Sequence, residues 1–395
     1  MRKKLFVLIG VCLVVLMMFG VKMTCFAEED KTIEDEIGEE VSGQIDDLDM
    51  SALENILKNI KDDDFKFFGG SSFRGVVEKI INGEYSNDAS SIFSALINLV
   101  FEDVLEFLPI LTTIVAIGIL CGFICAIKSG VSGKSVGDIV HFVCFSVIVV
   151  LVIKVVASMV SLTTSTMLMV QSQMEAIFPI LLTLITALGG TVSVSLFQPT
   201  IALLTSGIIA IFTKFVMPIF IFSFVFSIIS NLTNAVKLNK FSGFFNSLFK
   251  YTIGFILTIF TAFLSIQGIA ANSHDGVSFR TAKFAIKSYV PVLGGYLSDG
   301  LDVILTSSML VKNAVGVSGM ILLFATIIVP LVKICAFILC LKLTAAILEP
   351  VADSKIANFV GGVSKTMSML VVMILGVSFM YVISAGVLMA TANFI

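Results

Sequence analysis

The sequence predicts an all-α, polytopic membrane protein, and three observations lead to this fold class. Of the 395 residues, 57% are hydrophobic and only 13% are charged, whereas a soluble domain carries about 25% charged residues. Several apolar runs exceed the roughly 18 residues that indicate a membrane-spanning segment. These runs are continuous and do not alternate in polarity, which favours helices over the strands of a membrane barrel.

The first element, residues 1–27, has the pattern of a secretory signal peptide. Three basic residues precede an apolar run over 5–21, and the small residues that follow fit cleavage between Ala27 and Glu28. An uncleaved anchor helix is the alternative. Either reading places the mature N-terminus outside the cytoplasm.

The second element, residues 28–103, is predicted to be a small acidic extracytoplasmic region with short helices. Residues 28–64 hold 15 acidic side chains against three lysines. Apolar residues recur at helical spacing from Leu53 to Ile60, which predicts an amphipathic helix. An acidic run is usually a solvated surface, and the alternative is a surface that binds a partner.

The third element, residues 104–395, is predicted to be the membrane domain, and it contains an internal repeat. Shifting the chain by 112 residues pairs one set of prolines with another at identical separation. The repeat units are about 175–285 and 287–395, with a partial unit over about 104–160. Each unit has a proline, an apolar helix, a lysine-bearing loop and a second apolar helix. The prolines expected to mark kinks in the repeats are Pro179, Pro218, Pro291 and Pro330.

The repeat predicts six core spans, arranged as Pro-bearing helical hairpins. The hairpin loops are basic, so we expect them in the cytoplasm. The connectors 161–217 and 271–329 must then start and end outside, and they contain short apolar pieces broken by Gly and Pro. We expect these connectors to be interrupted or re-entrant, since such segments at matching positions of two repeats indicate a transport path. Ordinary hairpins or surface helices are the alternative.

Five residues are candidates for lining such a path or binding a partner. Asp299 and Asp302 follow the Gly294–Gly295 pair in the second connector. Lys342 lies deep in an apolar segment, where an unpaired charge costs at least roughly 2.5–3.5 kcal/mol, so a pairing carboxylate is expected. The alternatives are a solvated loop for the aspartates and a lysine whose ammonium reaches the headgroups.

The sequence offers no pattern of catalysis or cofactor binding. Ser132-Gly133-Lys134-Ser135 lacks the earlier glycine and the preceding strand of a phosphate-binding loop. Zinc-ligand spacings and nucleophile motifs are missing, and the chain has two histidines. We therefore expect no enzymatic activity, no cofactor and no bound metal. A solvated basic patch is missing too, which argues against nucleic acid as a partner.

The stretch 283–319 carries the most specific resemblance, and it reads KFAIKSYVPVLGGYLSDGLDVILTSSMLVKNAVGVSG. Together with the leader, the acidic segment and the repeats, it resembles the stage III sporulation protein AE family of endospore-forming Firmicutes. The resemblance implies a multi-pass protein of the mother-cell membrane around the forespore. It also implies partners, namely a secretion-type ATPase and ring-forming membrane proteins of the same complex.

Within that complex, the resemblance implies a permease-like or export-gate-like subunit of a channel that feeds the forespore during late development. Two alternatives stay open at this point: an independent secondary transporter with the repeats as its halves, and a non-conducting membrane scaffold for the complex. Association with further copies of the chain is also compatible with the sequence.

Overall fold

The structure, a computed structural model, describes residue 38 and residues 40–46, 48–58, 72–84, 89–128, 134–232, 239–289, 294–352 and 354–392. Its regular elements in this part of the chain are helical. The short ones are α3 (Ser51–Lys58) and α5 (Phe73–Ile81). The long ones are α6 (Ala89–Lys128), α7 (Lys134–Ala187), α11 (Asn239–Tyr289), α12 (Gly294–Leu348) and α13 (Ser354–Ala390).

One further rod is built from five consecutive helical pieces over residues 191–232. They are α8 (Thr191–Ala202), η1 (Leu203–Ile208), α9 (Ile209–Ile211), η2 (Phe212–Val216) and α10 (Met217–Leu232). The segments η1 and η2 are π-helical, with wider turns than an α-helix. Pro218 lies two residues after the end of η2. A proline lacks the N–H that would bond to the carbonyl four residues earlier, and that carbonyl, of Lys214, lies in η2.

Six helical rods in the described part of the chain are long and apolar enough to cross a membrane. This agrees in number with the six core spans predicted from the sequence. The rods are much longer than a bilayer requires, because α7, α11 and α12 have 54, 51 and 55 residues. At 1.5 Å per residue they measure about 80 Å, against a hydrocarbon core of about 30 Å.

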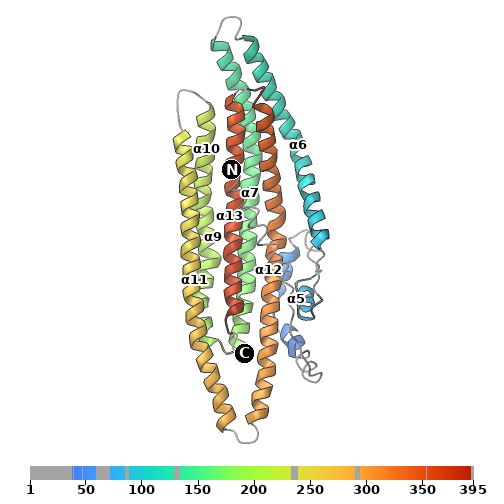
Figure 1. Cartoon of the computed structure of the whole chain (residues 1–395), viewed down its shortest axis with the longest axis vertical. Coiled ribbons are helices and arrows are strands. Elements are labelled where there is room, and N and C mark those ends of the chain that lie inside the picture. The colour runs from blue at the N-terminus through green and yellow to red at the C-terminus, as the bar shows by residue number, and fades with distance from the viewer. Residues whose placement is uncertain are drawn as a thin grey trace.

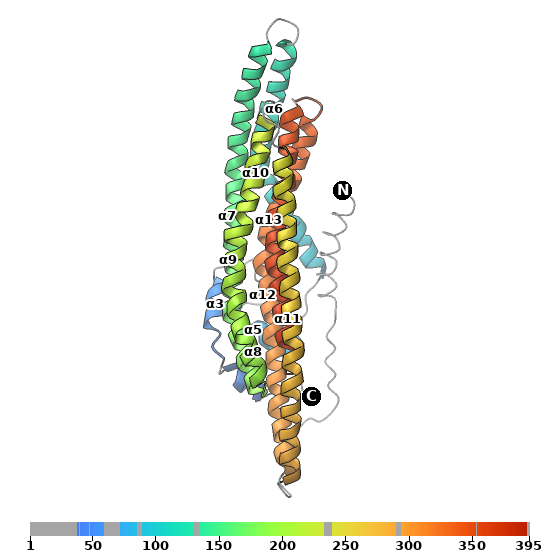
Figure 2. The same cartoon turned by 90° about the vertical axis from the view of Figure 1, so that its left-hand side faces the viewer.

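The rods form one elongated up-and-down bundle (Figure 1). In an apolar stretch of 18 residues of α13, 61% of the residues are buried, whereas the corresponding stretch of α11 has 17% buried, so α13 is central and α11 lies at the edge. The α6–α7 hairpin projects at one end, and the α11–α12 hairpin projects at the other. Figure 2 shows that the α11–α12 hairpin also extends beyond α8 and beyond the end of α13.

The structure corrects the prediction of interrupted or re-entrant connectors. Residues 161–175 do not break the chain, since α7 runs through them as one helix. The hydroxyls of Thr163, Thr164 and Thr166 donate to carbonyls four residues earlier, at 2.8–3.0 Å, which lets polar residues remain inside a helix. The first connector is therefore an ordinary hairpin, the alternative left open above, and its turn lies at Gly189–Gly190, where Gly189 has φ 83°.

The second connector also consists of continuous helix on both sides. Residues 271–289 continue α11, and α12 begins at Gly294 and runs without a break to Leu348. Of the four predicted kink-marking prolines, Pro179 and Pro330 lie inside α7 and α12, and Pro218 is the second residue of α10. Pro291 lies outside the described residues, as do Ala27 and Glu28 of the predicted cleavage site. The repeat and the signal peptide stay predictions.

A small amphipathic module packs on the side of the bundle. The helices α3 and α5 contact α7 and α12 respectively, and they bury Leu53, Phe73 and Val77. Their outer surface is charged: the Arg74 guanidinium donates to carboxylates of Asp46 and Glu78, and its side chain is 46% exposed. A charged outer face of this kind fits water, so this side of the bundle faces an aqueous compartment.

Candidate functional site

The predicted path residues fall on α12, and the structure does not bring them together. Gly294 and Gly295 form the first turn of α12 and are not part of an irregular segment. Asp299 lies in the same helix, with its side chain outside the described part, and Asp302 is half-buried. Asp299 and Asp302 are 40 or more residues from Lys342 on one continuous helix, about 60 Å along its axis.

Lys342 does not sit inside the bundle, as a lysine paired with a buried carboxylate would. Its side chain is exposed, and the neighbouring Leu339, Leu343 and Ile347 are about half exposed on the same helix. Lys342 is six residues before the end of α12, about 9 Å along the axis. A lysine stem can bridge that distance while its ammonium reaches water or headgroups.

A different lysine is the buried one. Lys312 on α12 has 0% exposed surface, and its Nζ donates to the backbone carbonyl of Thr391 at 2.5 Å. Burying an ammonium without a partner is very costly, and carbonyls at a helix C-terminus carry partial negative charge. Thr391 directly follows the last residue of α13, so Lys312 joins the middle of one helix to the end of another.

The chain directly after α13 has a specific conformation and packs against the turn between α7 and α8. Ala392 has φ 60°, a left-handed conformation that a residue with a Cβ rarely adopts. The turn glycine Gly190 faces Ala392, because a Cβ at Gly190 would lie 3.3 Å from the Cβ of Ala392. The α7–α8 turn, the end of α13 and Lys312 thus meet at the level where the α11–α12 hairpin leaves the bundle.

Two buried hydrogen bonds link α12 to its neighbours further along. The amide Nε2 of Gln173 on α7 donates to the hydroxyl of Thr326, and Gln173 is fully buried. The Tyr381 hydroxyl on α13 donates to the carbonyl of Gly319 at 3.0 Å. Gly319 is needed there, since a Cβ would lie 2.9 Å from the Tyr381 hydroxyl. These contacts fix the register of α7, α12 and α13.

An ion pair holds α6 against α12. Lys333 Nζ lies 2.7 Å from a carboxylate oxygen of Glu106, with the side chains 27% and 56% exposed. The same ammonium lies 6.0 Å from the centre of the Phe107 ring, a distance at which a cation is attracted by an aromatic face. Lys333, one of the lysines near a repeat proline, therefore has an identified partner.

The Gly118 and Gly122 pair on α6 faces the end of α12 at very short range. A Cβ at Gly118 would lie 2.5 Å from a methyl of Leu348, and one at Gly122 would lie 2.1 Å from the carbonyl oxygen of Val351. A Gly-x-x-x-Gly face allows such close helix packing. In this chain it is used within the bundle.

Outside the membrane spans, two groups in the described part of the chain have shifted pKa values. Hydrogen bonds from Ser51 to the Asp49 carboxylate lower the pKa of Asp49, which lies just before α3. The Glu78 and Asp46 carboxylates raise the pKa of Arg74 above its ordinary value.

Lys312, Gln173 and Tyr381 were not predicted from the sequence to make buried contacts. A spacing signal existed for the lysine: Ser308 and Lys312 are four residues apart, on one helix face, and both are buried. Within the described ranges, no group of three or more His, Cys, Asp or Glu side chains is placed to hold a metal ion. The contacts above join helices to one another.

The fold and these contacts define the class: a multi-pass helical membrane protein whose long helices are locked together by a few buried polar contacts. A family model described as stage III sporulation protein AE matches residues 71–392. The chain therefore belongs to the stage III sporulation protein AE family, and the resemblance read from residues 283–319 is confirmed.

A curated relative agrees with this assignment. Stage III sporulation protein AE of Bacillus subtilis (strain 168) is 28% identical over 331 residues, which cover 82% of this chain and 82% of that protein. No solved structure matches the chain. The chain is thus a multi-pass membrane protein of a sporulation family.

Proposed function

We propose that this chain is the membrane-embedded, permease-like or export-gate-like subunit of a channel complex between the mother cell and the forespore. In this role it resides in the mother-cell membrane, has no enzymatic activity of its own and is required for late forespore development. Family membership supports the sporulation role, and the helical bundle supports the membrane location.

One observation carries the proposal: the helices are more than twice as long as the hydrocarbon core is thick. Rods of 51–55 residues extend about 80 Å, so the bundle reaches well into the aqueous space. The projecting α11–α12 hairpin and the charged α3–α5 module lie toward the same end (Figure 1). A subunit of this shape suits a role that joins a bilayer to extracytoplasmic partners, such as ring-forming proteins. The opposite hairpin, α6–α7, then faces the cytoplasm and an ATPase.

The topology behind this proposal is tested by labelling single cysteines in intact cells with a membrane-impermeant maleimide. Phe284 and Leu301 are exposed on the projecting hairpin, and Ile139 is exposed near the start of α7. We expect labelling of cysteines at positions 284 and 301 from outside, and labelling at position 139 only after the cytoplasm is opened. Labelling of all three from the same side would refute the arrangement.

The conduit role is tested in vesicles that contain only this chain. A subunit that works within a complex moves no solute alone, and flux should appear only when partner proteins are added. Solute uptake without partners would instead favour an independent secondary transporter. Sporulation that survives when conduction is blocked would favour a scaffold.

The predicted path residues can be tested in sporulating cells. Alanine at Asp299 and Asp302 is expected to reduce spore yield while leaving the amount of protein in the membrane unchanged. Glu175, exposed on α7, provides a matched carboxylate control. An unchanged spore yield in the double aspartate variant would remove both residues from the proposed path.

A further inference from the structure

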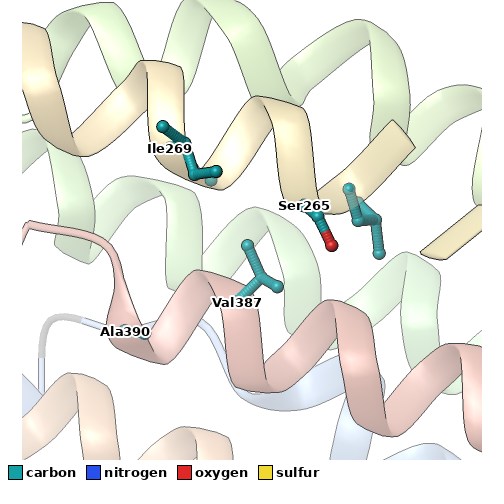
Figure 3. Close-up of a pocket in the computed structure, with 6 residues that line it drawn as sticks. Ser265, Ile269, Val387 and Ala390 are labelled. Carbon is teal, nitrogen blue, oxygen red and sulfur yellow. The ribbon is translucent and has the colours of Figure 1, made fainter. Parts of the chain in front are cut away.

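The outer surface of the bundle has a hollow between α11 and the end of α13. Figure 3 shows Ser265 and Ile269 of α11 opposite Val387 and Ala390 of α13 at this hollow. The exposed apolar side chains of α11 around it, from Tyr251 to Ile269, rise about 27 Å. The hydrocarbon core of a bilayer, about 30 Å thick, covers such a surface. The hollow therefore belongs to the side that faces lipid and is not part of a route through the bundle.

Inside the bundle, one face of α12 carries a row of polar groups. Ser308, Lys312 and Thr326 are buried there. Between them lies Gly319, whose carbonyl accepts from the Tyr381 hydroxyl, and the steps along the row are four, seven and seven residues. Four residues are about one turn of an α-helix and seven are about two, so the groups line up along one face. The row extends over about 27 Å within the apolar span of α12, close to the thickness of the hydrocarbon core.

The neighbouring helices α7 and α13 meet this row with polar groups of their own. The amide of Gln173 on α7 donates to Thr326. On the side of α13, Tyr381 donates to the carbonyl of Gly319, and the carbonyl of Thr391 accepts from the ammonium of Lys312. These side chains and carbonyls form a polar seam where α7, α12 and α13 meet. Its members are Gln173, Ser308, Lys312, Thr326, Tyr381 and Thr391.

Two atoms of the polar seam are buried without a partner. Other buried hydroxyls of the same helices are satisfied by their own helix: those of Ser318, Ser378 and Ser384 donate to carbonyls four residues earlier, at 2.7–2.8 Å. The Oε1 of Gln173 and the hydroxyl of Ser308 have no hydrogen-bond partner in the described part of the chain. A buried polar group that stays unpaired is unfavourable, so these two atoms call for a ligand.

A contact that only joined two helices would not need these atoms. The Gln173 amide uses one of its two ends on Thr326, and the Thr326 hydroxyl donates in turn to the carbonyl of Leu322 at 2.9 Å. The other end of the amide is left for a further ligand. Buried polar atoms of this kind pair with ordered water. In membrane spans, buried polar and ionisable groups mark pathways for water, protons or solutes.

We propose that the polar seam binds water and is the route along which the membrane part of the bundle opens. The second half of this inference rests on the proposed function. The contact at Gly319 closes the route here, since a Cβ at Gly319 would lie 2.7 Å from Ile177 and 2.9 Å from the Tyr381 hydroxyl. The two unpaired atoms lie on either side of this contact, at the levels of Ser308 and Thr326. The bond from Tyr381 to Gly319 can exchange for bonds to water at small net cost.

Water in the polar seam can be detected by brief X-ray irradiation of the full chain in lipid nanodiscs. Bound water is converted to hydroxyl radicals, which oxidise the side chains next to it. We expect oxidation of Tyr381, although it is 0% exposed. Its hydroxyl shares the site at Gly319 with Ile177, which follows Gln173 by one turn on the same face of α7.

Phe145 provides the control for this measurement. It is also 0% exposed, on α7, and its ring packs against Phe359 with 5.1 Å between the ring centres. It lies about 42 Å along α7 from Gln173, in apolar surroundings. Phe145 should stay unmodified at the dose that oxidises Tyr381.

Combining Gln173→Met with Thr326→Val removes polar groups of the seam at almost constant volume. Replacing both partners of a buried hydrogen bond by apolar groups of similar shape is nearly neutral for stability, so the protein should reach the membrane in normal amount. Tyr381 should lose most of its oxidation, and spore yield should fall. Thr326→Ser keeps the hydroxyl and should keep both. Thr163→Val is the matched control, since the buried Thr163 hydroxyl donates to Met159 of its own helix and lies outside the seam.

Two results would overturn the proposal. An unoxidised Tyr381 in the unmodified chain would mean that the seam is dry. A normal spore yield in the double variant would mean that the seam is not the route, and Thr326→Val alone decides this question where the double variant does not reach the membrane. Failure of the proposed function differs from both: vesicles that hold only this chain would take up solute, and the oxidation of Tyr381 would persist.

Discussion

Replacing Gly122 by alanine tests how closely α6 packs against the turn between α12 and α13. The added Cβ would lie 2.1 Å from the carbonyl oxygen of Val351 and 3.1 Å from the Cα of Ala352. Both are backbone atoms. The turn cannot move away freely, because the N–H groups of Val351 and Ala352 both donate to the carbonyl of Leu348, at 3.2 and 2.8 Å.

The magnitude follows from two opposing terms. Overpacking a well-packed contact costs about 1–3 kcal/mol, and replacing glycine by alanine inside a helix gains up to about 1 kcal/mol. The second term alone is isolated by Gly243→Ala, since Gly243 is helical and a Cβ there meets nothing within 4 Å. The two variants should therefore differ by about 1–3 kcal/mol in free energy of unfolding.

Gly118→Ala completes the series with an intermediate clash. Its Cβ would lie 2.5 Å from a terminal methyl of Leu348, which can change rotamer at modest cost. We expect stability to fall in the order Gly243→Ala, Gly118→Ala, Gly122→Ala, measured as the SDS fraction that unfolds the purified protein in mixed micelles. Equal stability of the variants at 122 and 243 would refute the close contact of α6 with the turn.

Three further predictions concern polar contacts. Tyr381→Phe removes one buried hydrogen bond and should destabilise the same purified protein by about 0.5–1.5 kcal/mol, whereas no change would mean that the hydroxyl is solvated. Reversing the charge of Lys333 or of Glu106 alone should destabilise the protein, and reversing both should restore its stability. Because the pair is partly exposed, the coupling energy between the two residues should be at most about 1 kcal/mol. The lowered pKa of Asp49 means that the hydrogen bonds from Ser51 stabilise the start of α3 above the unfolded value of 3.8 and are lost as pH falls through the folded pKa. Proteolysis near α3 should therefore increase at acidic pH, and the increase should be smaller after Asp49→Asn.

The apolar runs, grouped by the repeat, led to the prediction of six membrane-spanning helices, and the described part of the chain has six helical rods of this kind. The helical type followed from hydropathy, because a continuous apolar run of this length has few stable alternatives in lipid. The glycines in the first connector mark its turn and not a re-entrant segment, since Gly189 adopts the positive φ that the turn requires.

The prediction of interrupted or re-entrant connectors was wrong for a local reason. The stretch 161–175, rich in Ser, Thr and Gln, lies in the connector that was expected to be interrupted. In the helix the hydroxyls of Thr163, Thr164 and Thr166 bond back to the preceding turn and so do not interrupt it. Polar residues along the chain therefore do not show where a long helix ends. The glycine pair at the turn marks the end of α7.

The burial of individual charged side chains could not be predicted from the sequence alone. Lys312 and Lys342 both lie in α12, but one is buried and the other exposed. The difference depends on which face of α12 meets α13. The rotation of α12 about its own axis, which decides this, cannot be predicted from the sequence. The buried lysine also needed an acceptor 79 residues away, at the end of another helix.

The length of α12 has a mechanical consequence. Its 55 residues run without a break from the projecting hairpin to the far end of the bundle, so the helix is a stiff rod of about 80 Å. A tilt of about 5° around one end of such a rod displaces its other end by about 7 Å. A partner bound at the tip of the hairpin could therefore tilt α12 as a lever. A small rotation at the tip would move the other end of α12, relative to the helices around it, by more than the width of a side chain.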